Sequence, residues 1–362
     1  ATLHPSRTIM QLPELVSALP RADRARFERV YHVSGADGRL HAPAPMVPWI
    51  EKTFGDLATV ESQRIVRVSN RVTGEGTLFN ELRAQRPVRA ALKINNGIAP
   101  ALKDDPWANP IETTPEDTFG RLSNEYGLTA ANVAKYDAMH SIIVFSEPDP
   151  LAFTQDSVVA HLALAHDWIS RAHEDDAEAR YPYIMWNCLW RAGGSVVHGH
   201  MQVSLARVRH YAKIERLRAD AERYRDANRT SYFDDLVRIH ASLGLSHQVG
   251  GVEVLASLTP LKEKECILIA DSPGRALSAA VFDVLRVYRD SLKVQSFNMG
   301  ILLPPIGVTG ESWDRFPIIV RLVDRGSLET RTSDIGGMEM FAESVVAADP
   351  FAIHRSLVAE GA

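Results

Sequence analysis

The sequence of 362 residues is longer than one typical domain, which favours two domains or one large duplicated fold. Hydrophobic residues make up 45% and charged residues 23%, the composition of a globular protein that can bury a sizeable core. The net charge of −5 excludes a general attraction to nucleic acid or anionic membranes, so any anion must be bound in a local pocket.

The cysteine content and the hydropathy pattern argue against several further classes of protein. Cys188 and Cys266 are the two cysteines and no CxxC pair occurs, which argues against a disulfide scaffold and against a cysteine-rich zinc site. No apolar run approaches the roughly 20 residues of a membrane span, and the first residues lack the pattern of a signal peptide. We therefore expect a cytoplasmic protein.

The first half of the chain predicts strands around one long helix. Residues 1–62 mix charge with proline and predict a helical lead-in with irregular structure. An alternating strand, QRIVRVSN, then leads through a TGEG turn to TLFNELRAQRP. After a long Pro- and Asp-rich loop come a strand, an amphipathic helix and two more strands: SIIVFSEP, QDSVVAHLALAHDWISRAHEDD, YPYIMWNCLWR and SVVHGHMQVSLA.

The second half repeats this order. A long charged helix, RVRHYAKIERLRADAERYRDANR, forms a plausible bridge with a solvated face. Strand, helix, strand and strand then recur in KECILIADS, RALSAAVFDVLRVYRDSLK, QSFNMGILLPP and FPIIVRLVDRG. The pattern predicts an α+β fold of two tandem units, with boundaries at 63–208 and 209–362 after the lead-in 1–62.

The stretch AGGSVVHGHMQVSLA carries the chemistry of the first unit. Side chains at alternate positions of a strand share a face, so His198, His200 and Gln202 are predicted to line up. Gly193 and Gly194 allow close approach of a ligand, and their amides and the Ser195 hydroxyl could donate to an anion. The second copy has no histidine at the corresponding place.

Three interpretations of this strand compete. Its polar groups could simply face water. The two histidines could bind a metal, as in barrels of the cupin type, but the sequence nearby offers only His210 as a third ligand. A neutral imidazole could instead attack an α-phosphate and form a nucleotidyl-histidine, with Gln202 and glycine amides holding the phosphate oxygens. Only the third interpretation explains every polar residue of the stretch.

These residues resemble the signature of the galactose-1-phosphate uridylyltransferase branch of the histidine-triad (HIT) superfamily. The signature is Asn, then Gly and Ser, then His-x-His-x-Gln, and it is matched here by Asn187, Gly193, Ser195, His198, His200 and Gln202. The resemblance implies that each unit is an antiparallel sheet, or half-barrel, with packed helices. It also implies that His200 is the nucleophile, that Gln202 and Ser195 steady the phosphates, and that Asn187 braces the loop.

Three other segments are similar to this family. TGEGTLFNELRAQRP resembles a segment whose arginines approach the nucleotide phosphates, which nominates Arg83 and Arg86. ANVAKYD resembles a segment that contacts base and ribose, which nominates Asn132 and Lys135. IGGMEMF resembles a sugar-pocket motif and would place Gly337 and Glu339 beside the second substrate.

The chain also departs from the family. Many members bind zinc through a CxxC, a later histidine and the first histidine of HxHxQ. Here the matching stretch DDPWANPIETTPED has no cysteine, and the place of the later histidine falls near Asp149, in SEPDP, which has no histidine. The histidines that hold iron in some members are also missing. We therefore expect no zinc, no iron and no other cofactor, with His198 acting as a hydrogen-bonding or structural residue.

The resulting hypothesis is a metal-independent, cytoplasmic nucleotidyltransferase. It would move an NMP group, through nucleotidyl-His200, from a nucleoside diphosphate sugar or dinucleoside polyphosphate to a sugar phosphate or phosphate acceptor. The resemblance also implies a homodimer, without nucleic acid or membrane partners. A nucleotide-sugar or dinucleotide phosphorylase or hydrolase is the nearest alternative, and a metal-binding barrel or a non-catalytic nucleotide-sugar binding protein is more distant.

Overall fold

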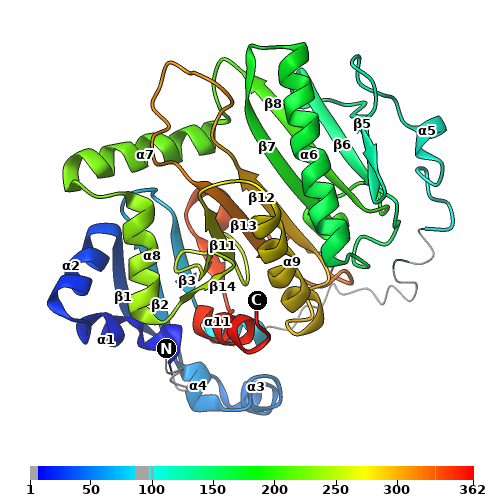
Figure 1. The fold of residues 1–362 in the computed structure, drawn as a ribbon. Coiled ribbons are helices and arrows are strands. Elements are labelled where there is room, and N and C mark those ends of the chain that lie inside the picture. The colour runs from blue at the N-terminus through cyan, green and yellow to red at the C-terminus, as the bar shows by residue number, and fades with distance from the viewer. Residues whose placement is uncertain (1–6, 86–97, 99–101, 331) are drawn as a thin grey trace.

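The computed structural model describes residues 7–85, 98, 102–330 and 332–362, and its architecture is α+β with antiparallel pairing in nearly every strand contact. One sheet has ten strands in the order β4-β5-β6-β8-β7-β12-β13-β11-β10-β9. A second sheet has four strands in the order β1-β2-β3-β14. Figure 1 shows the large sheet running across the molecule with long helices packed on it.

The large sheet has the same strand order in both of its halves. In the first half β5, β6 and β8 lead to β7, and in the second half β10, β11 and β13 lead to β12. The two halves join where β7 pairs with β12. The strands are β4 (Ser123–Asn124), β5 (Gly127–Ala131), β6 (Met139–Phe145), β7 (Ala179–Cys188), β8 (His200–Arg207), β9 (Ser246–Val249), β10 (Val252–Ala256), β11 (Cys266–Ala270), β12 (Phe297–Leu302) and β13 (Ile318–Asp324).

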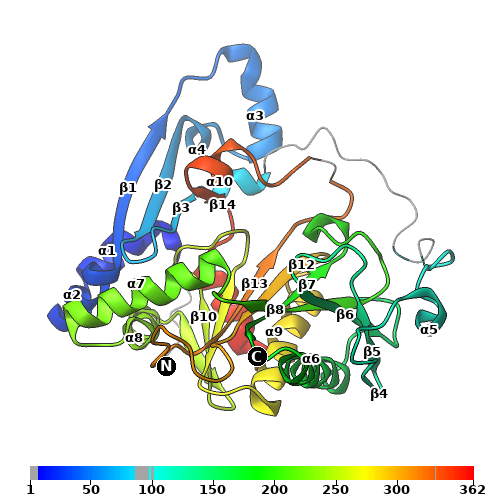
Figure 2. The same cartoon turned by 90° about the horizontal axis from the view of Figure 1, so that it is seen from above.

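Two helices cover one face of this sheet. On the opposite face, β10, β11 and β13 pack on a second apolar cluster, while β8 carries the polar residues His200 and Gln202. Helices α6 (Gln155–Asp175) and α9 (Arg275–Asp290) lie side by side on the first face, as Figure 2 shows. Alternate residues of β7, such as Ile184 and Trp186, are fully buried beneath them, while Tyr183, Met185 and Asn187 are half-buried on the other face. This two-residue alternation separates a dry core from a face on which ligands can bind.

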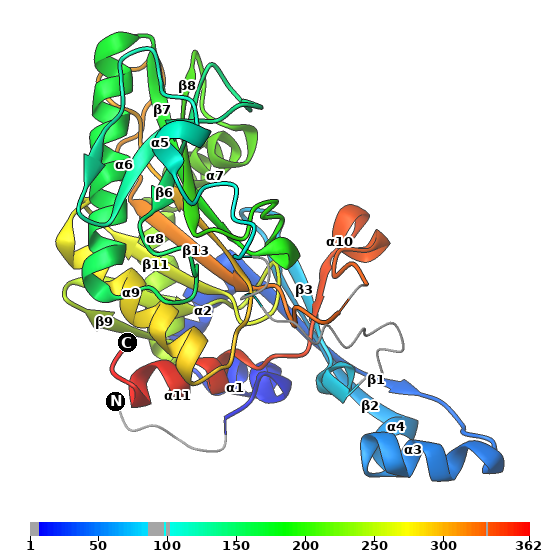
Figure 3. The ribbon, with the colours of Figure 1, turned by 90° about the vertical axis from the view of Figure 1, so that its right-hand side faces the viewer.

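The small sheet forms an arm beside the open face. It contains β1 (Tyr31–Arg39), β2 (Ser62–Asn70), β3 (Gly76–Phe79) and β14 (Ser344–Val346). The far end of the β1–β2 ribbon carries α3 (Val47–Phe54) and α4 (Leu57–Glu61) and projects away from the large sheet in Figure 3. The parallel pair β3–β14 ties this arm to the C-terminal part of the chain.

Several of the remaining helices contribute to a second core, whereas α5 and α10 bury no residue. Phe27, Phe233 and Leu236 belong to a second apolar cluster, built by α2, α8 and the strands of the arm. These helices are α1 (Leu12–Ser17), α2 (Arg21–Val30), α5 (Pro110–Thr113), α7 (Ala212–Asn228), α8 (Tyr232–Leu243), α10 (Gly337–Phe341) and α11 (Pro350–Ala359).

Most of the predicted elements are confirmed, with two corrections. The predicted strand over SVVHGHMQVSLA begins only at His200, because Ser195–Gly199 form a bend in which Gly199 bonds to Pro148 and Phe145 instead. The lead-in is more regular than predicted, since β1 extends over nine residues within it and pairs with β2. The domain limits at residues 62 and 208 stay predictions.

No helix within the described part of the chain is both long enough and apolar enough to cross a membrane.

The buried face of β7 should dominate the stability of the large sheet. Ile184 is 0% exposed and Ile111, in α5, is 69% exposed. We expect Ile184→Ala to lower the free energy of unfolding by about 2–5 kcal/mol, because it opens a cavity under α6. The matched control, Ile111→Ala, should change it by less than about 0.5 kcal/mol. Urea denaturation of both variants measures the difference, and equal losses would contradict this description of the core.

Candidate active site

The candidate site lies at the start of β8, in the middle of the first half of the large sheet. β8 pairs with β6, where Val144 is opposite His200, and with β7, where Met185 is opposite Gln202. His200 and Gln202 are two residues apart, so both side chains point to the face that α6 and α9 leave open. This part of the prediction is confirmed by the strand geometry.

The hydrogen bonding of His200 fixes its tautomer. Its Nδ1 atom lies 2.8 Å from the backbone carbonyl oxygen of His198. A carbonyl only accepts, so Nδ1 carries the proton and Nε2 carries the lone pair. Among the described residues none donates to Nε2, which leaves this atom available to an incoming group.

Burial keeps the His200 ring uncharged. The residue is 6% exposed, and burial lowers the pKa of His200 below the ordinary value of 6.5, against the opposing effect of the hydrogen bond to His198. A neutral imidazole with a free Nε2 lone pair is the nucleophilic form of histidine.

Trp107 forms a wall beside the nucleophile. Its ring meets the His200 ring edge-on, with the centroids 4.9 Å apart and the planes at 86°. Below it, Trp107 packs on a small apolar cluster that includes Ile142 and Val144 from β6. The indole therefore fixes the plane of the imidazole and keeps water from one side of it.

His198 is held by two acceptors. Its Nδ1 lies 2.6 Å from Asp105 Oδ2, and its Nε2 lies 2.8 Å from the carbonyl oxygen of Phe145. Asp105 also accepts from the backbone N–H of Trp107 through Oδ1, at 2.9 Å. These contacts at both ring nitrogens fix the position of the His198 side chain.

The same contacts bear on the zinc site that the resemblance implies. Both ring nitrogens of His198 are already bonded, and among the described residues Asp105 is the one acidic group that pairs with it. Within the described ranges, no group of three or more His, Cys, Asp or Glu side chains could hold a metal ion. The residues present at His198 do not fit a zinc ion.

Gln202 is oriented by a buried histidine, His140, in β6. The backbone N–H of Tyr136 donates to His140 Nδ1 at 2.9 Å, so His140 Nε2 carries the proton and donates to Gln202 Oε1 at 3.0 Å. Burial lowers the pKa of His140 and keeps this ring neutral. The carboxamide oxygen of Gln202 is thereby engaged, and its NH₂ group is the end left to donate to a ligand.

The two candidates from ANVAKYD lie next to this histidine. Lys135 Nζ and the backbone N–H of Asn132 both donate to the carbonyl oxygen of His140, at 2.7 and 3.2 Å. Asn132 Oδ1 accepts from the N–H of Ala134. Asn132 and Lys135 therefore contact the backbone of His140, and the side chain of His140 in turn bonds to Gln202.

The glycine loop between β7 and β8 is tightly folded on itself. The Gly193 amide donates to the Trp190 carbonyl and the Gly194 amide to the Leu189 carbonyl, so neither amide is free for a ligand as the sequence suggested. Gly194 is needed for its small size, because a Cβ there would lie 2.8 Å from the carbonyl oxygen of Asn187. Ser195, the next residue, is exposed.

Asn187 connects this loop to the second half of the sheet. The Nδ2 group of Asn298, in β12, donates to Asn187 Oδ1 at 2.7 Å and to the Ala192 carbonyl at 2.8 Å. The bond to the loop carbonyl is therefore made by Asn298, while Asn187 supplies a second acceptor for the same amide, and the bracing role of Asn187 stays a prediction.

Arg83, Gly337 and Glu339 are not among the described residues that are found in contact with His200. Arg83 is exposed on a short 3₁₀ turn, Glu81–Gln85, after β3. Arg86 falls outside the described residues. Gly337 is exposed and Glu339 is half-buried on α10, where the Glu339 carboxylate accepts from the Gly336 amide.

Sequence reasoning missed four residues of the site: Asp105, Trp107, His140 and Asn298. A signal existed for the first two, since DDPW occupies the stretch where the family has its zinc cysteines. His140 and Asn298 gave no local signal, because each acts through a strand distant in sequence.

The fold is similar to that of several solved structures. The predicted resemblance to the galactose-1-phosphate uridylyltransferase-like branch of the histidine-triad superfamily is confirmed at the level of the fold. No protein-family model matches the sequence, and no curated protein matches it as a relative.

Three solved structures carry the likeness. An ADP-glucose phosphorylase from Arabidopsis thaliana, solved with bound ADP-glucose, has a TM-score of 0.62 at 13% identity, over 80% of this chain and 97% of its own. A GalT-like protein, also from Arabidopsis thaliana, has a TM-score of 0.58 at 13% identity, over 80% and 96%. A uridylyltransferase has a TM-score of 0.53 at 11% identity, over 82% and 98%.

The tautomer and charge of His200 can be measured directly. We expect long-range ¹H–¹⁵N spectra to show the Nδ1–H tautomer, because Nδ1 faces a carbonyl, and to show a neutral ring from pH 8 to below pH 6.5, because burial lowers its pKa. The His200→Gln spectrum assigns the signal. A ring protonated at Nε2, or one that becomes charged above pH 6.5, would contradict the geometry.

Proposed function

We propose that this protein is a nucleotidyltransferase that moves an NMP group through a covalent intermediate on His200. The donor is a nucleoside diphosphate sugar or a dinucleoside polyphosphate, and the acceptor is a sugar phosphate or phosphate. The observation that supports this most strongly is the His200 ring itself, which is buried and bonded at Nδ1 with Nε2 open. The likeness to the ADP-glucose phosphorylase and the uridylyltransferase supports the substrate class.

In the first step, Nε2 of His200 attacks the α-phosphorus of the donor. A P–N bond forms and the P–O bond to the β-phosphate breaks, so the sugar phosphate leaves with the electron pair. Its oxygen is a weak base at neutral pH, so no proton donor is required. The Nδ1 proton stays on the ring, and the His198 carbonyl stabilises the positive charge that develops there.

In the second step, an oxygen of the acceptor phosphate attacks the same phosphorus. The P–N bond breaks and its electron pair returns to Nε2, which restores the neutral imidazole. The Gln202 NH₂ group donates to a non-bridging oxygen in both steps, since His140 holds its carbonyl end. Ser195 is assigned as a second donor, and Arg83 and Arg86 are assigned to the nucleotide phosphates.

Asn132 and Lys135 are assigned to the nucleotide side of the site, and Gly337 and Glu339 to the acceptor side. We propose that each half of the large sheet, with its shared strand order, is one HIT-like unit and that the chain works as a cytoplasmic homodimer.

The reaction is proposed to need no metal. His198 is occupied by Asp105 and Phe145, so these contacts take the structural place that zinc has in the family. Adduct formation should be unchanged after dialysis against a chelator, with elemental analysis of the same sample as the check. A loss of the adduct that added zinc restores would contradict this part of the proposal.

Intact-protein mass spectrometry tests the intermediate. After brief incubation with UDP-, ADP- and GDP-sugars or diadenosine polyphosphate, at alkaline pH to protect the P–N bond, one donor should add the mass of its NMP. The adduct should be absent in His200→Ala, and added imidazole should restore turnover in His200→Gly, because the cavity can hold a free nucleophile. Donor breakdown without an acceptor would favour a hydrolase, and no adduct with a bound donor would favour a binding protein.

The His140–Gln202 contact predicts a second kinetic effect. Gln202→Ala should slow adduct formation by about 10²-fold or more, as removal of one oxyanion donor does. His140→Phe should slow it in the same direction but less, because the amide remains and only its orientation is lost. Single-turnover rates measure both, with His240→Phe, another buried histidine outside the site, as the control for stability. A wild-type rate in Gln202→Ala would remove its assigned role.

A further inference from the structure

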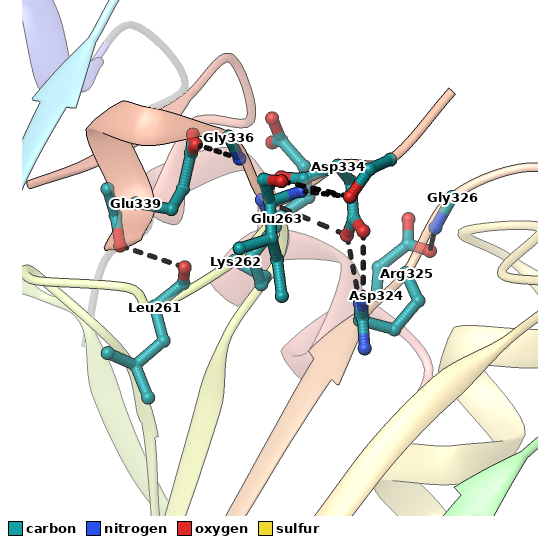
Figure 4. A network of polar contacts seen from close by, with 12 residues as sticks. Leu261, Lys262, Glu263, Asp324, Arg325, Gly326, Asp334, Gly336 and Glu339 are labelled. Atoms are coloured by element: carbon teal, nitrogen blue, oxygen red, sulfur yellow. Dashed lines mark hydrogen bonds and ion pairs between the residues drawn. The ribbon is translucent and has the colours of Figure 1, made fainter. Parts of the chain in front are cut away.

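Beside the glycine loop, three cations surround a single carboxylate. Arg325 forms a bidentate pair with Asp334, at 2.9 and 2.8 Å, and Lys262 Nζ lies 3.8 Å from the same carboxylate. Arg191 Nη2, from the glycine loop, lies 3.9 Å from Asp334 Oδ1. Figure 4 shows Asp334 between Lys262 and Arg325. We call these four residues the Asp334 cluster.

The cluster has more positive charge than its own carboxylate can neutralise. Its side chains are only 11–21% exposed, with Arg191 at 11%, Lys262 at 13%, Arg325 at 14% and Asp334 at 21%. Burial raises the pKa of Asp334, but the hydrogen bonds of Arg325 and the charges of Arg325 and Lys262 outweigh it and lower the pKa below its ordinary value. Partly buried cations in excess attract a further anion, and arginine forks bind phosphate in the same way as carboxylate.

One of the cations also has an unused donor. The Nε atom of Arg191 is buried and has no hydrogen-bond partner among the described residues, while its Nη1 donates to the Thr332 carbonyl at 2.6 Å. A buried guanidinium N–H without an acceptor is costly, so an anion bound here would gain more than the Coulomb attraction alone.

The position of the cluster relative to His200 follows from the strand order. The pairing of β7 with β8 ends at Met185 and Gln202, two residues before Asn187 on β7 and two residues after His200 on β8, and β12 places Asn298 opposite Asn187. Arg325 Nη1 donates to Asn298 Oδ1 at 2.5 Å. Since neighbouring strands are about 4.8 Å apart, Asn298 lies roughly 10 Å from the nucleophile strand, and the Arg325 guanidinium is bonded to it.

We propose that the Asp334 cluster is the binding site for a second anionic group on the acceptor, about one hexose away from the phosphate that attacks at His200. Asp334 occupies this site when no acceptor is bound, and the second anion takes its place on Arg325, Lys262 and Arg191. This inference rests on the proposed function and narrows its substrate class to acceptors that carry two anionic groups, such as a sugar bisphosphate.

A neutral sugar fits this end of the site poorly. Its hydroxyls carry no charge to offset three partly buried cations. Arg325 would also have to give up its hydrogen bonds to Asp334 in order to bind these hydroxyls. A phosphate can replace the Asp334 carboxylate, because its oxygens accept the same bidentate hydrogen bonds from Arg325.

The test compares glucose 1-phosphate with glucose 1,6-bisphosphate as acceptors that discharge the isolated nucleotidyl-enzyme. The two sugars differ only in the second phosphate, at the far side of the ring. We expect the bisphosphate to have at least a tenfold higher kcat/KM, which is about the effect of one charge-assisted hydrogen bond. The ratio of the two values is the readout, because a loss of folded protein changes both sugars equally.

Variants of the cluster should move this ratio in opposite directions. Lys262→Met should bring it towards one, since it removes a cation whose contacts among the described residues are with Asp334. Asp334→Asn should raise it, because it removes the competing charge and keeps the side-chain shape. Arg207→Gln is the control, since it breaks the Arg207–Asp176 ion pair at the other end of β8 and should leave the ratio unchanged.

The outcomes separate this inference from the function on which it rests. If no nucleotidyl adduct forms with any donor, the proposed function fails. If the adduct forms but both sugars discharge it equally, or neither does, or if Asp334→Asn loses stability with no change in the ratio, the cluster only anchors its loop and the inference is overturned.

Discussion

The hydrogen bond from Nδ1 of His200 to the His198 carbonyl is the contact on which the rest of the site depends. It decides which ring nitrogen carries the lone pair, and therefore whether an imidazole in this place is a nucleophile at all. The carbonyl is itself held in place, because the His198 side chain is fixed between Asp105 and Phe145. A pair of side-chain contacts thus controls the chemistry of the neighbouring residue through the backbone.

The sheet supplies the second requirement, which is that polar groups from different strands meet on one face. His140, Gln202, Asn187 and Asn298 come from four strands, and they form two hydrogen-bonded pairs across β6–β8 and β7–β12. In each pair, one side chain (Gln202 or Asn187) is oriented through its carbonyl oxygen and keeps an NH₂ group that the pair does not use. The other face is closed by α6 and α9, so the cost of burying these polar groups is offset by a large apolar core.

The sequence predicted the positions of His200 and Gln202 better than those of the residues around them, and the reasons are physical. His200 and Gln202 share a face because of a local two-residue period, and both could be identified from HxHxQ. His198 was expected on the same strand, but Gly199 bonds to Pro148 and ends the regular pairing before it. The amides of Gly193 and Gly194 looked free because nothing local shows that the loop folds back on Leu189 and Trp190. The repeated strand, helix, strand, strand order was visible in the sequence, whereas the β7–β12 pairing that joins the halves, and with it Asn298, depends on contacts more than a hundred residues apart.

That junction also has a consequence for the order in which the protein is made. β8 can be enclosed early, because its neighbours β6 and β7 precede it in the chain. The outer edge of β7 has no partner until β12 has been synthesised, and β7 ends at Cys188 while β12 begins at Phe297. During translation this edge, with its apolar residues, is open to pairing with other chains unless α6 covers one of its faces first. The long intervening segment, with α7 and α8, therefore sets how long the nascent first half must persist with one unpaired strand.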